Sequence, residues 1–383
     1  MDDAVMIVGG GPAGISTWLH LQKNAPRLAE GSILIEKAVF PRDKLCAGGL
    51  CIWGADVLAY LEVDLDIPSL FVSDLELRFG KEIRRLHQDN CFRVVQRMDL
   101  DNALKETAVN RGLDLHENEM LLDVLRTRHE LIVTTNKGTY DVQVLVGADG
   151  AFSTVRRKMI PSRKRHLSGT LQIFAPIHSS YDTEFDEKKM VVDLTPMNEG
   201  LQGYVWHVPC LRKKAHYIAH GICDFRVCPA KPRAEMKRIF GRELESRNIH
   251  LGPKTWSSHP IPWNSDDDIL SQPNVILVGD AAGVEPAFGG GIHLALSYGE
   301  IAAQAIIDAF LNDDFSFRDY QHRIESHSVG KFIAKCTSLA LAMYDGKMNP
   351  LDAVQEVFAT KYDPAEVIRQ VLARYLELHP QSS

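Results

Sequence analysis

Residues 3–22 read "DAVMIVGGGPAGISTWLHLQ", and this stretch decides the fold. A short apolar run, typical of a buried strand, is followed by a glycine-rich turn and then by a helical pattern. Gly9, Gly11 and Gly14 have the G-x-G-x-x-G spacing. In this motif the first glycine makes a tight turn, the second lets the backbone approach a pyrophosphate, and the third lets the helix pack closely on the strand. Because the motif joins a strand to a helix, it predicts a dinucleotide-binding unit of the Rossmann type.

An acidic residue at the expected distance supports this interpretation. The apolar run at residues 33–35 ends in Glu36, about 20 residues beyond the glycines, where a carboxylate can accept hydrogen bonds from ribose hydroxyls. One residue departs from the usual pattern. Trp18 occupies a helix position that is commonly small, so we expect the helix to sit unusually against its sheet.

The composition narrows the class of protein. The chain has 383 residues, 45% of them hydrophobic, and this length predicts two or three domains. The net charge of −7 argues against a nucleic-acid partner. The seven cysteines are odd in number and form no C-x-x-C pair, which is typical of free thiols in the cytoplasm. The histidines lack metal-binding spacing, so we predict no metal site. We also expect neither a secretory signal nor a transmembrane helix.

Two later segments have the pattern of a strand that ends in an acidic residue. Residues 144–159 read "VLVGADGAFSTVRRKM", and residues 274–306 hold a strand that ends in Gly279-Asp280, a proline-bearing loop, three glycines and a long helix. Together with Arg97, these segments resemble the FAD-binding motifs of aromatic-hydroxylase-like flavoproteins. The resemblance implies FAD as the cofactor, with Asp280 beside its ribityl and pyrophosphate groups and residues 289–291 beside its isoalloxazine ring.

Physical reasoning supports the role of the glycines. A helix that opens at Ile292 would point free N–H groups at the ring and stabilise negative charge on its reduced form. For Asp280 an alternative is open, because an aspartate before a helix can serve as its N-cap.

Two further elements indicate one branch of these flavoproteins. Residues 40–50, "FPRDKLCAGGL", resemble the K-x-C-G-G loop of the geranylgeranyl reductase family, and residues 203–209, "GYVWHVP", resemble its Tyr-x-Trp-x-Phe-Pro signature. Three positions depart from the family pattern: Ala47 stands for a glycine, Val208 stands for phenylalanine, and Gly221 is all that is left of a trailing Gly-x-Gly. The resemblance implies a flavin-dependent reductase of isolated carbon–carbon double bonds in isoprenoid chains.

The residues of these two elements have chemistry that suits this reaction. Tyr204 and Trp206 are two apart on a predicted strand, so both point to one face and can form an aromatic wall for an apolar substrate. Cys46 is a candidate proton donor, either directly or through a water molecule. It can also serve only as a flavin or substrate contact, and the aromatic pair can be ordinary sheet core.

Other functions share this fold. A monooxygenase that hydroxylates a small aromatic or apolar compound is the main alternative, and a non-redox flavin-binding protein is a further one. A flavin halogenase is disfavoured, because residues 45–80 hold no lysine to carry an activated halogen.

The expected architecture is an α/β fold with three parts. Residues 1–158 and 265–325 form a Rossmann-type FAD-binding domain, with 71–97 partly contributing to the substrate sheet. Residues 159–264 form an antiparallel β-sheet substrate domain, and residues 326–383 form a helical C-terminal region.

The predicted site follows from these motifs. The candidate catalytic residues are Cys46, Tyr204 and Trp206. The candidate FAD-binding residues are Gly9, Gly11, Pro12, Ala13, Gly14, Glu36, Lys37, Arg42, Ala47, Gly48, Arg97, Asp149, Asp280, Gly290, Gly291 and Ile292. The electron donor is left open between NADPH, NADH and ferredoxin. We expect an apolar small-molecule substrate and a cytoplasmic location, with peripheral membrane contact left open and no prediction of the oligomeric state.

Overall fold

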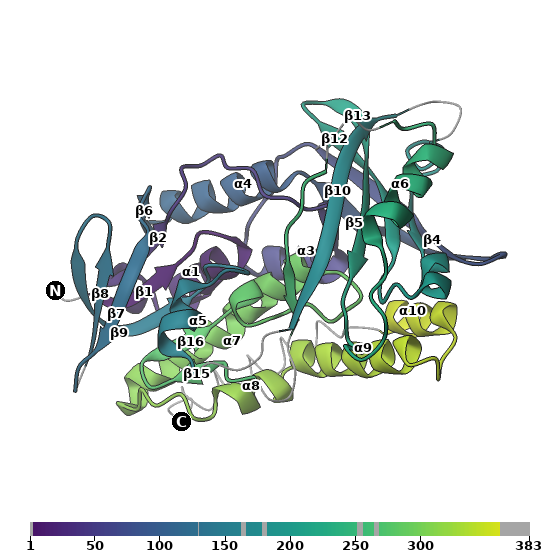
Figure 1. Cartoon of the computed structure of the whole chain (residues 1–383). Helices are drawn as coiled ribbons and strands as arrows, with labels where there is room; N and C mark the ends of the chain where they lie inside the picture. Colours follow the sequence, from purple (N-terminus) through teal and green to yellow (C-terminus); the bar gives the residue numbers. More distant parts are fainter. Residues whose placement is uncertain are drawn as a thin grey trace, which may run out of the picture.

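The computed structural model describes residues 3–128, 130–161, 166–177, 182–250, 256–263 and 268–360. Two sheets lie side by side, and helices flank them (Figure 1). This arrangement confirms the expected α/β fold with a Rossmann-type sheet, a second and mainly antiparallel sheet, and a helical C-terminal part.

The first sheet is built around β1, the strand of the opening motif. Its main path runs β15-β16-β9-β1-β2-β6, with β1 parallel to both β2 and β9. Residues 5–8 are buried, which explains their unbroken apolar run, since both faces of a parallel sheet are covered. The strands of this sheet are β1 (Asp3–Val8), β2 (Ser32–Glu36), β6 (Asp114–Glu117), β7 (Leu121–Arg126), β8 (Leu131–Thr135), β9 (Thr139–Gly147), β15 (Ser271–Gln272) and β16 (Val275–Leu277).

Helices α1 (Pro12–Asn24) and α7 (Gly291–Asn312) pack against each other beside this sheet. Helix α1 lies close to the turn after β1 even though it carries the large Trp18 side chain. The closeness is clear at Gly14, where an added Cβ atom would lie only 2.0 Å from the Gly9 carbonyl oxygen. The Trp18 ring is buried, and its Nε1 donates a hydrogen bond to the Ala29 carbonyl oxygen in α2 (Pro26–Glu30), at 3.4 Å. The large side chain is therefore accommodated beside α2.

The second sheet has the order β14-β10-β13-β12-β11-β4-β5-β3. Three of its strands come from the first hundred residues, and β4 pairs with β11 in parallel while the other pairs are antiparallel. Its strands are β3 (Gly49–Cys51), β4 (Ser69–Phe79), β5 (Glu82–Val95), β10 (His166–Pro176), β11 (Lys189–Asp193), β12 (Val205–Arg212), β13 (Ala215–Asp224) and β14 (Ile261–Trp263).

The remaining elements cover the sheets and join them. They are α3 (Ile52–Tyr60), α4 (Arg97–Asn110), α5 (Thr154–Met159), η1 (Thr195–Glu199), α6 (Met236–Ser246), η2 (Gly279–Ala281), α8 (Tyr320–Ser326), α9 (Ser328–Tyr344) and α10 (Pro350–Ala359). Helix α10 packs on α9 and on β4, so the C-terminal part closes one side of the second sheet (Figure 1). The helical pattern expected at residues 364–379 lies outside the described residues.

Helix α7 is unusually long and apolar. Among the described residues it is the helix long and apolar enough to cross a membrane, but 72% of its apolar stretch is buried inside the fold. Its place between α1, α3 and η2 identifies it as a core helix.

Candidate active site

One cavity of about 1220 Å³ is lined by residues of both sheets. Pockets for a single drug-sized ligand have volumes of about 300–1,000 Å³. The cavity is therefore large enough for a dinucleotide and part of a second molecule.

The turn after β1 forms the first wall of this cavity. Gly9 has φ +112°, and a Cβ atom there would lie 2.4 Å from the Ala148 carbonyl oxygen. By contrast, the nearest atom to a Cβ on Gly11 would be Arg42 Nη2 at 3.7 Å, so this glycine leaves its backbone exposed to the cavity. Gly11, Pro12 and Ala13 line the cavity at the N-terminus of α1, a position that suits a phosphate group.

Glu36 lies at the end of β2, as the sequence predicts, and is buried. Its Oε2 accepts a hydrogen bond from the Gly10 N–H at 2.9 Å, and its Oε1 accepts one from the Ala38 N–H at 3.0 Å. Lys37 and Arg42 line the cavity beside it. The carboxylate is thus held at the turn where a ribose would lie.

Two arginines form a basic wall around one buried carboxylate, Asp101. Arg97 donates two hydrogen bonds to Asp101, at 2.7 and 2.8 Å, and Arg42 Nη1 lies 3.1 Å from Asp101 Oδ2. Burial alone would lower the pKa of Arg97, but Asp101 raises it overall, so the guanidinium stays charged. Arg42 Nε is buried 3.6 Å from Glu36 Oε2, and the Arg42 side chain lines the cavity, so the wall offers positive charge to an anionic group of the cofactor.

Asp149 lines the cavity but is also engaged by the protein. Its Oδ2 accepts hydrogen bonds from the Thr154 and Val155 N–H groups at the start of α5, and its Oδ1 accepts one from the Ser153 hydroxyl. Burial raises the pKa of this carboxyl. The structure therefore shows that Asp149 anchors the start of α5. Its role toward the cofactor stays a prediction.

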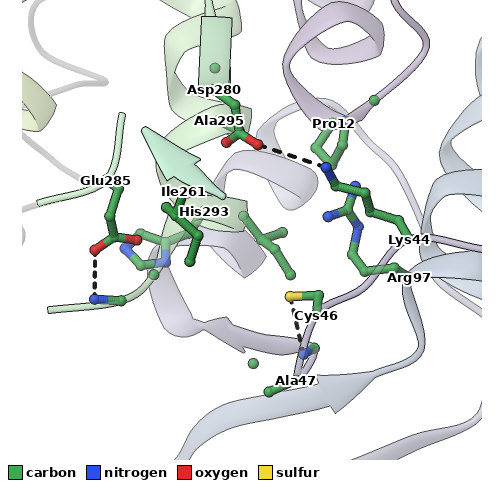
Figure 2. Close-up of a pocket in the computed structure, with 18 of the residues that line it drawn as sticks. Pro12, Lys44, Cys46, Ala47, Arg97, Ile261, Asp280, Glu285, His293 and Ala295 are labelled. Atoms are coloured by element: carbon green, nitrogen blue, oxygen red, sulfur yellow. Dashed lines mark hydrogen bonds and ion pairs between the residues drawn. The ribbon is translucent and has the colours of Figure 1, made fainter. Parts of the chain in front are cut away.

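Asp280 and Lys44 both line the cavity, and their side chains point toward one another (Figure 2). The two side chains form an ion pair, with Nζ 3.9 Å from Oδ2, and Lys44 Nζ lies 2.6 Å from His259 Nε2. Burial lowers the pKa of Lys44. Burial, and to a smaller extent the positive charge of Lys44, lowers the pKa of His259 to about 4. Asp280 lies inside η2, and Gly290 is the N-cap of α7, so the alternative of Asp280 as a helix N-cap is wrong.

The glycine-rich loop leads into α7, which begins at Gly291, one residue before the predicted Ile292. Gly290 adopts the left-handed conformation with φ +107° and is the N-cap residue of α7. A Cβ atom on Gly290 would lie 2.4 Å from the His293 ring, whereas a Cβ on Gly291 would meet nothing within 4 Å. The bare start of α7 thus faces open space where a planar ring can lie against backbone N–H groups.

The Cys46 loop is pinned to the second sheet. Gly48 has φ +87°, and a Cβ atom there would lie 1.8 Å from the Val95 carbonyl oxygen in β5. The Gly48 N–H donates a hydrogen bond to Cys46 Sγ at 3.3 Å (Figure 2), and Gln172 Nε2 donates one to the Cys46 carbonyl oxygen at 3.3 Å. Ala47 and Gly48 line the cavity along with Cys46.

The predicted aromatic pair lines the cavity on the side of the second sheet. The ring centroids of Tyr204 and Trp206 are 6.0 Å apart, and the Tyr204 hydroxyl donates a hydrogen bond to the Phe288 carbonyl oxygen at 3.1 Å. A Cβ atom on Gly221 would lie 2.0 Å from the Trp206 ring, so this glycine lets the indole lie flat on β13. Trp206 Nε1 is buried without a hydrogen-bond partner among the described residues.

Apolar side chains from three regions extend this wall away from the glycines. They come from the second sheet, from the loop before α7 and from helices α9 and α10: Leu75, Phe92, Met190, Val192, Val208, Phe225, Phe288, Phe332, Val354, Val357 and Phe358. The cavity thus has a polar end at the β1 turn and an apolar end between the second sheet and α10.

Sequence reasoning missed two ionisable residues near the glycine loop, Glu285 and His293. Glu285 is 4% exposed, accepts hydrogen bonds from the Phe288 and Gly289 N–H groups, and has its pKa raised to about 7 by burial. Burial lowers the pKa of His293 to about 4, and its Nδ1 has no partner among the described residues. A glutamate in an otherwise apolar loop between Asp280 and the glycines was the available signal.

The remaining predicted residue, Gly14, lies beneath the turn and shapes it, while the other predicted residues line the cavity. The cradle of bare glycine backbone, the basic wall and the carboxylate at the end of β2 fit FAD. Fold and site together define an FAD-dependent oxidoreductase, in which the bound flavin would supply hydride chemistry.

The comparisons with known proteins agree with this class. No family model matches the chain. Digeranylgeranylglycerophospholipid reductase 3 of Methanosphaera stadtmanae is 35% identical over 96% of this chain and 94% of its own length. Menaquinone reductase of Mycolicibacterium smegmatis is 24% identical over 81% of this chain and 77% of its own length. The chain belongs to the geranylgeranyl reductase family of FAD-dependent oxidoreductases.

Solved structures show the same fold. A geranylgeranyl bacteriochlorophyll reductase-like protein from Thermoplasma acidophilum superposes with a TM-score of 0.69 at 20% identity, covering 96% of this chain and 98% of that protein. A probable FAD-dependent monooxygenase from Pseudomonas aeruginosa superposes with a TM-score of 0.67 at 21% identity, covering 94% and 100%.

Proposed function

We propose that this protein reduces carbon–carbon double bonds in the isoprenoid chain of a lipid, with hydride from reduced FAD. The carrying observation is the continuous cavity, which passes from the glycine turn of β1 to an apolar end lined by aromatic and aliphatic side chains. Relatives named as reductases of geranylgeranyl compounds support this substrate class.

In this proposal the polar end of the cavity holds the adenosine and pyrophosphate of FAD. Glu36 accepts from the ribose, and Arg42 with Lys37 neutralises phosphate charge beside Gly11 and the start of α1. Arg97, Asp149 and Asp280 complete this part, as the sequence predicts. Gly290, Gly291 and Ile292 present N–H groups to the ring, with Ala47 and Gly48 across from them.

The apolar end holds the isoprenoid chain. Trp206 and Tyr204 face the chain where it meets the ring, because their side chains line the cavity next to the glycine loop. Burial of apolar surface supplies most of the binding free energy, at about 25 cal/mol per Å². Cys46 contacts the reacting groups from its loop.

Shielding from water is the second contribution of the protein. A hydride donor is protected when the site excludes bulk solvent, and the apolar wall achieves this once a chain fills it. The electron donor is open between NADPH, NADH and ferredoxin. We infer a cytoplasmic location with peripheral membrane contact, since the lipid substrate resides in a bilayer.

Oxygen separates this function from hydroxylation, the alternative that the shared fold allows. The FAD-loaded protein is reduced without oxygen and mixed with a geranylgeranyl lipid, while its absorbance reports flavin oxidation. The control is the fully saturated phytanyl lipid, which has the same headgroup and length. We expect oxidation with the unsaturated lipid alone and a product that has gained hydrogen. Turnover that requires oxygen and yields a hydroxylated product would show that the protein is a monooxygenase.

A further inference from the structure

Glu285 lies in the loop between η2 and α7, one turn of loop before the glycines that are proposed to meet the flavin ring. It is 4% exposed, and its side chain lines the cavity. Figure 2 shows its carboxyl group hydrogen-bonded to loop backbone, on a different side of the cavity from Cys46.

The hydrogen bonds of Glu285 leave room for a proton. The Phe288 and Gly289 N–H groups both donate to Oε1, at 3.1 and 2.7 Å. A proton on Oε2 therefore leaves both bonds intact. The Tyr204 hydroxyl donates to the Phe288 carbonyl oxygen of the same turn, so Glu285 and the aromatic wall are fixed to one short segment.

Glu285 differs from the three acidic residues that are predicted to bind the cofactor, Glu36, Asp149 and Asp280. Glu36 and Asp280 lie within 4 Å of a basic side chain, and Asp149 is engaged by the start of α5. Among the described residues, no lysine or arginine forms an ion pair with Glu285. Among the described residues, seven carboxylic residues line the cavity: Glu36, Asp43, Asp56, Glu119, Asp149, Asp280 and Glu285. Burial also raises the pKa of Asp56, but this side chain is only partly buried, whereas Glu285 is 4% exposed.

The surroundings favour the protonated form of this carboxyl. Burial raises its pKa to about 7, and the charge of Asp280 adds to this effect. Four further titratable groups interact with it electrostatically and are neutral at this pH, because burial raises the pKa of each of them: Tyr204, Cys223, Cys336 and Tyr344. Glu285 thus holds a proton near neutrality beside an apolar cavity.

We propose that Glu285 is the acid that delivers the proton to the double bond during reduction. This inference rests on the proposed function. The π electrons form a C–H bond with the proton, while the O–H bond of Glu285 breaks and leaves its electron pair on the carboxylate. The other carbon accepts a hydride, that is, a proton with two electrons, from the reduced flavin. The flavin is oxidised in this step. The carboxylate regains a proton from water between turnovers.

Two other groups of the cavity are alternative donors for this step. Cys46 Sγ accepts a hydrogen bond from the Gly48 N–H, but an accepted bond does not remove the thiol proton, so Cys46 is tested alongside Glu285. The Tyr204 phenol is a very weak acid, because burial raises its pKa well above the usual value. A carboxylic acid with a pKa near the working pH is better matched to proton transfer.

The test is the variant Glu285→Gln in the FAD-loaded protein. Its amide oxygen can still accept both loop hydrogen bonds, but it has no acidic proton. The reduced proteins are mixed without oxygen with a geranylgeranyl lipid, and flavin oxidation is timed from about pH 5 to about pH 9. A readout independent of turnover is the infrared C=O band of a protonated carboxylic acid, followed against pH in the native protein and the variant. Cys46→Ala is tested alongside.

We expect the native rate to fall above about pH 7 and Glu285→Gln to lose at least about 100-fold in rate, together with that pH dependence. The variant should keep its FAD and lose one infrared band that titrates near pH 7. A variant as fast as the native protein, or a large loss confined to Cys46→Ala, would overturn the assignment of Glu285. If the native protein itself is never oxidised by an unsaturated lipid, the proposed function fails first, and this inference fails with it.

Discussion

At the scale of single residues, the burial of Glu285 has a thermodynamic consequence. Its pKa rises from 4.5 to about 7 on folding, so the folded state holds this proton more tightly than the unfolded state does. The contribution is fully favourable below about pH 4.5 and is lost as pH rises through 7, with a total of about 3 kcal/mol. We expect Glu285 alone to lower the free energy of unfolding of the FAD-free protein by about this amount between acid and alkaline pH, on top of the contributions of other titrating groups.

The matched variant is Glu285→Gln, which removes the titrating group and keeps the acceptor oxygen. Urea unfolding at about pH 5 and about pH 8 compares the two proteins. The variant should lose the Glu285 part of the pH dependence and be the more stable protein at alkaline pH. Equal pH dependence in both proteins would mean that this carboxyl has an ordinary pKa.

At the scale of elements, the Cys46 loop contains two adjacent glycines, of which only the first has no room for a side chain. A Cβ atom on Gly48 would lie 1.8 Å from the Val95 carbonyl oxygen in a left-handed backbone, while a Cβ on Gly49 would meet its nearest atom, Met190 Cε, at 3.9 Å. We expect Gly48→Ala to destabilise the FAD-free protein by about 3 kcal/mol or more. Gly49→Ala should change stability by less than about 1 kcal/mol. Chemical denaturation measures both, and equal effects would contradict the geometry of this loop.

The start of α7 offers a second pair, which tests cofactor binding apart from folding. Gly291→Ala adds a methyl group into open space at the first helical position, so the FAD-free protein should keep its stability within about 1 kcal/mol. The same methyl group would occupy the place proposed for the ring and should weaken FAD binding by about 10-fold or more. Gly290→Ala, which meets the His293 ring, should reduce stability as well. Unchanged FAD affinity in Gly291→Ala, measured by flavin fluorescence, would place the ring elsewhere.

The elements differ in how well they could be predicted from the sequence. The strand–turn–helix at residues 3–22 was predictable because three glycines and a buried apolar run allow few other structures. Residues 71–97 were expected to contribute partly to the substrate sheet, and β4 and β5 lie in the second sheet. The place of β3 in that sheet was not predicted, because this three-residue strand pairs with β5, more than 40 residues further along the chain. Pairing between distant segments leaves no local pattern. For Glu285 the sequence shows a lone acidic residue in an apolar loop, but it does not show that the carboxyl is buried.

At the scale of the whole molecule, function depends on where the two sheets meet. The Rossmann-type sheet supplies the glycine turn and Glu36, while the second sheet supplies Trp206 and the apolar wall, and one cavity joins them. The division of the chain into domains stays a prediction, and the Cys46 loop shows why: it leaves the first sheet after β2 and ends as β3 in the second. A substrate bound by the second sheet should therefore lie against a cofactor bound by the first.

The measurement that tests this claim most directly is a difference spectrum of the oxidised, FAD-loaded protein titrated with a geranylgeranyl lipid. If flavin and chain share the cavity, displacement of water from the ring should shift the flavin absorbance in a saturable way, and Trp206→Leu should weaken the apparent affinity without loss of FAD. If the lipid binds, as shown by its retention with the protein, and the flavin spectrum does not change, the chain lies away from the ring and the shared-cavity account is wrong.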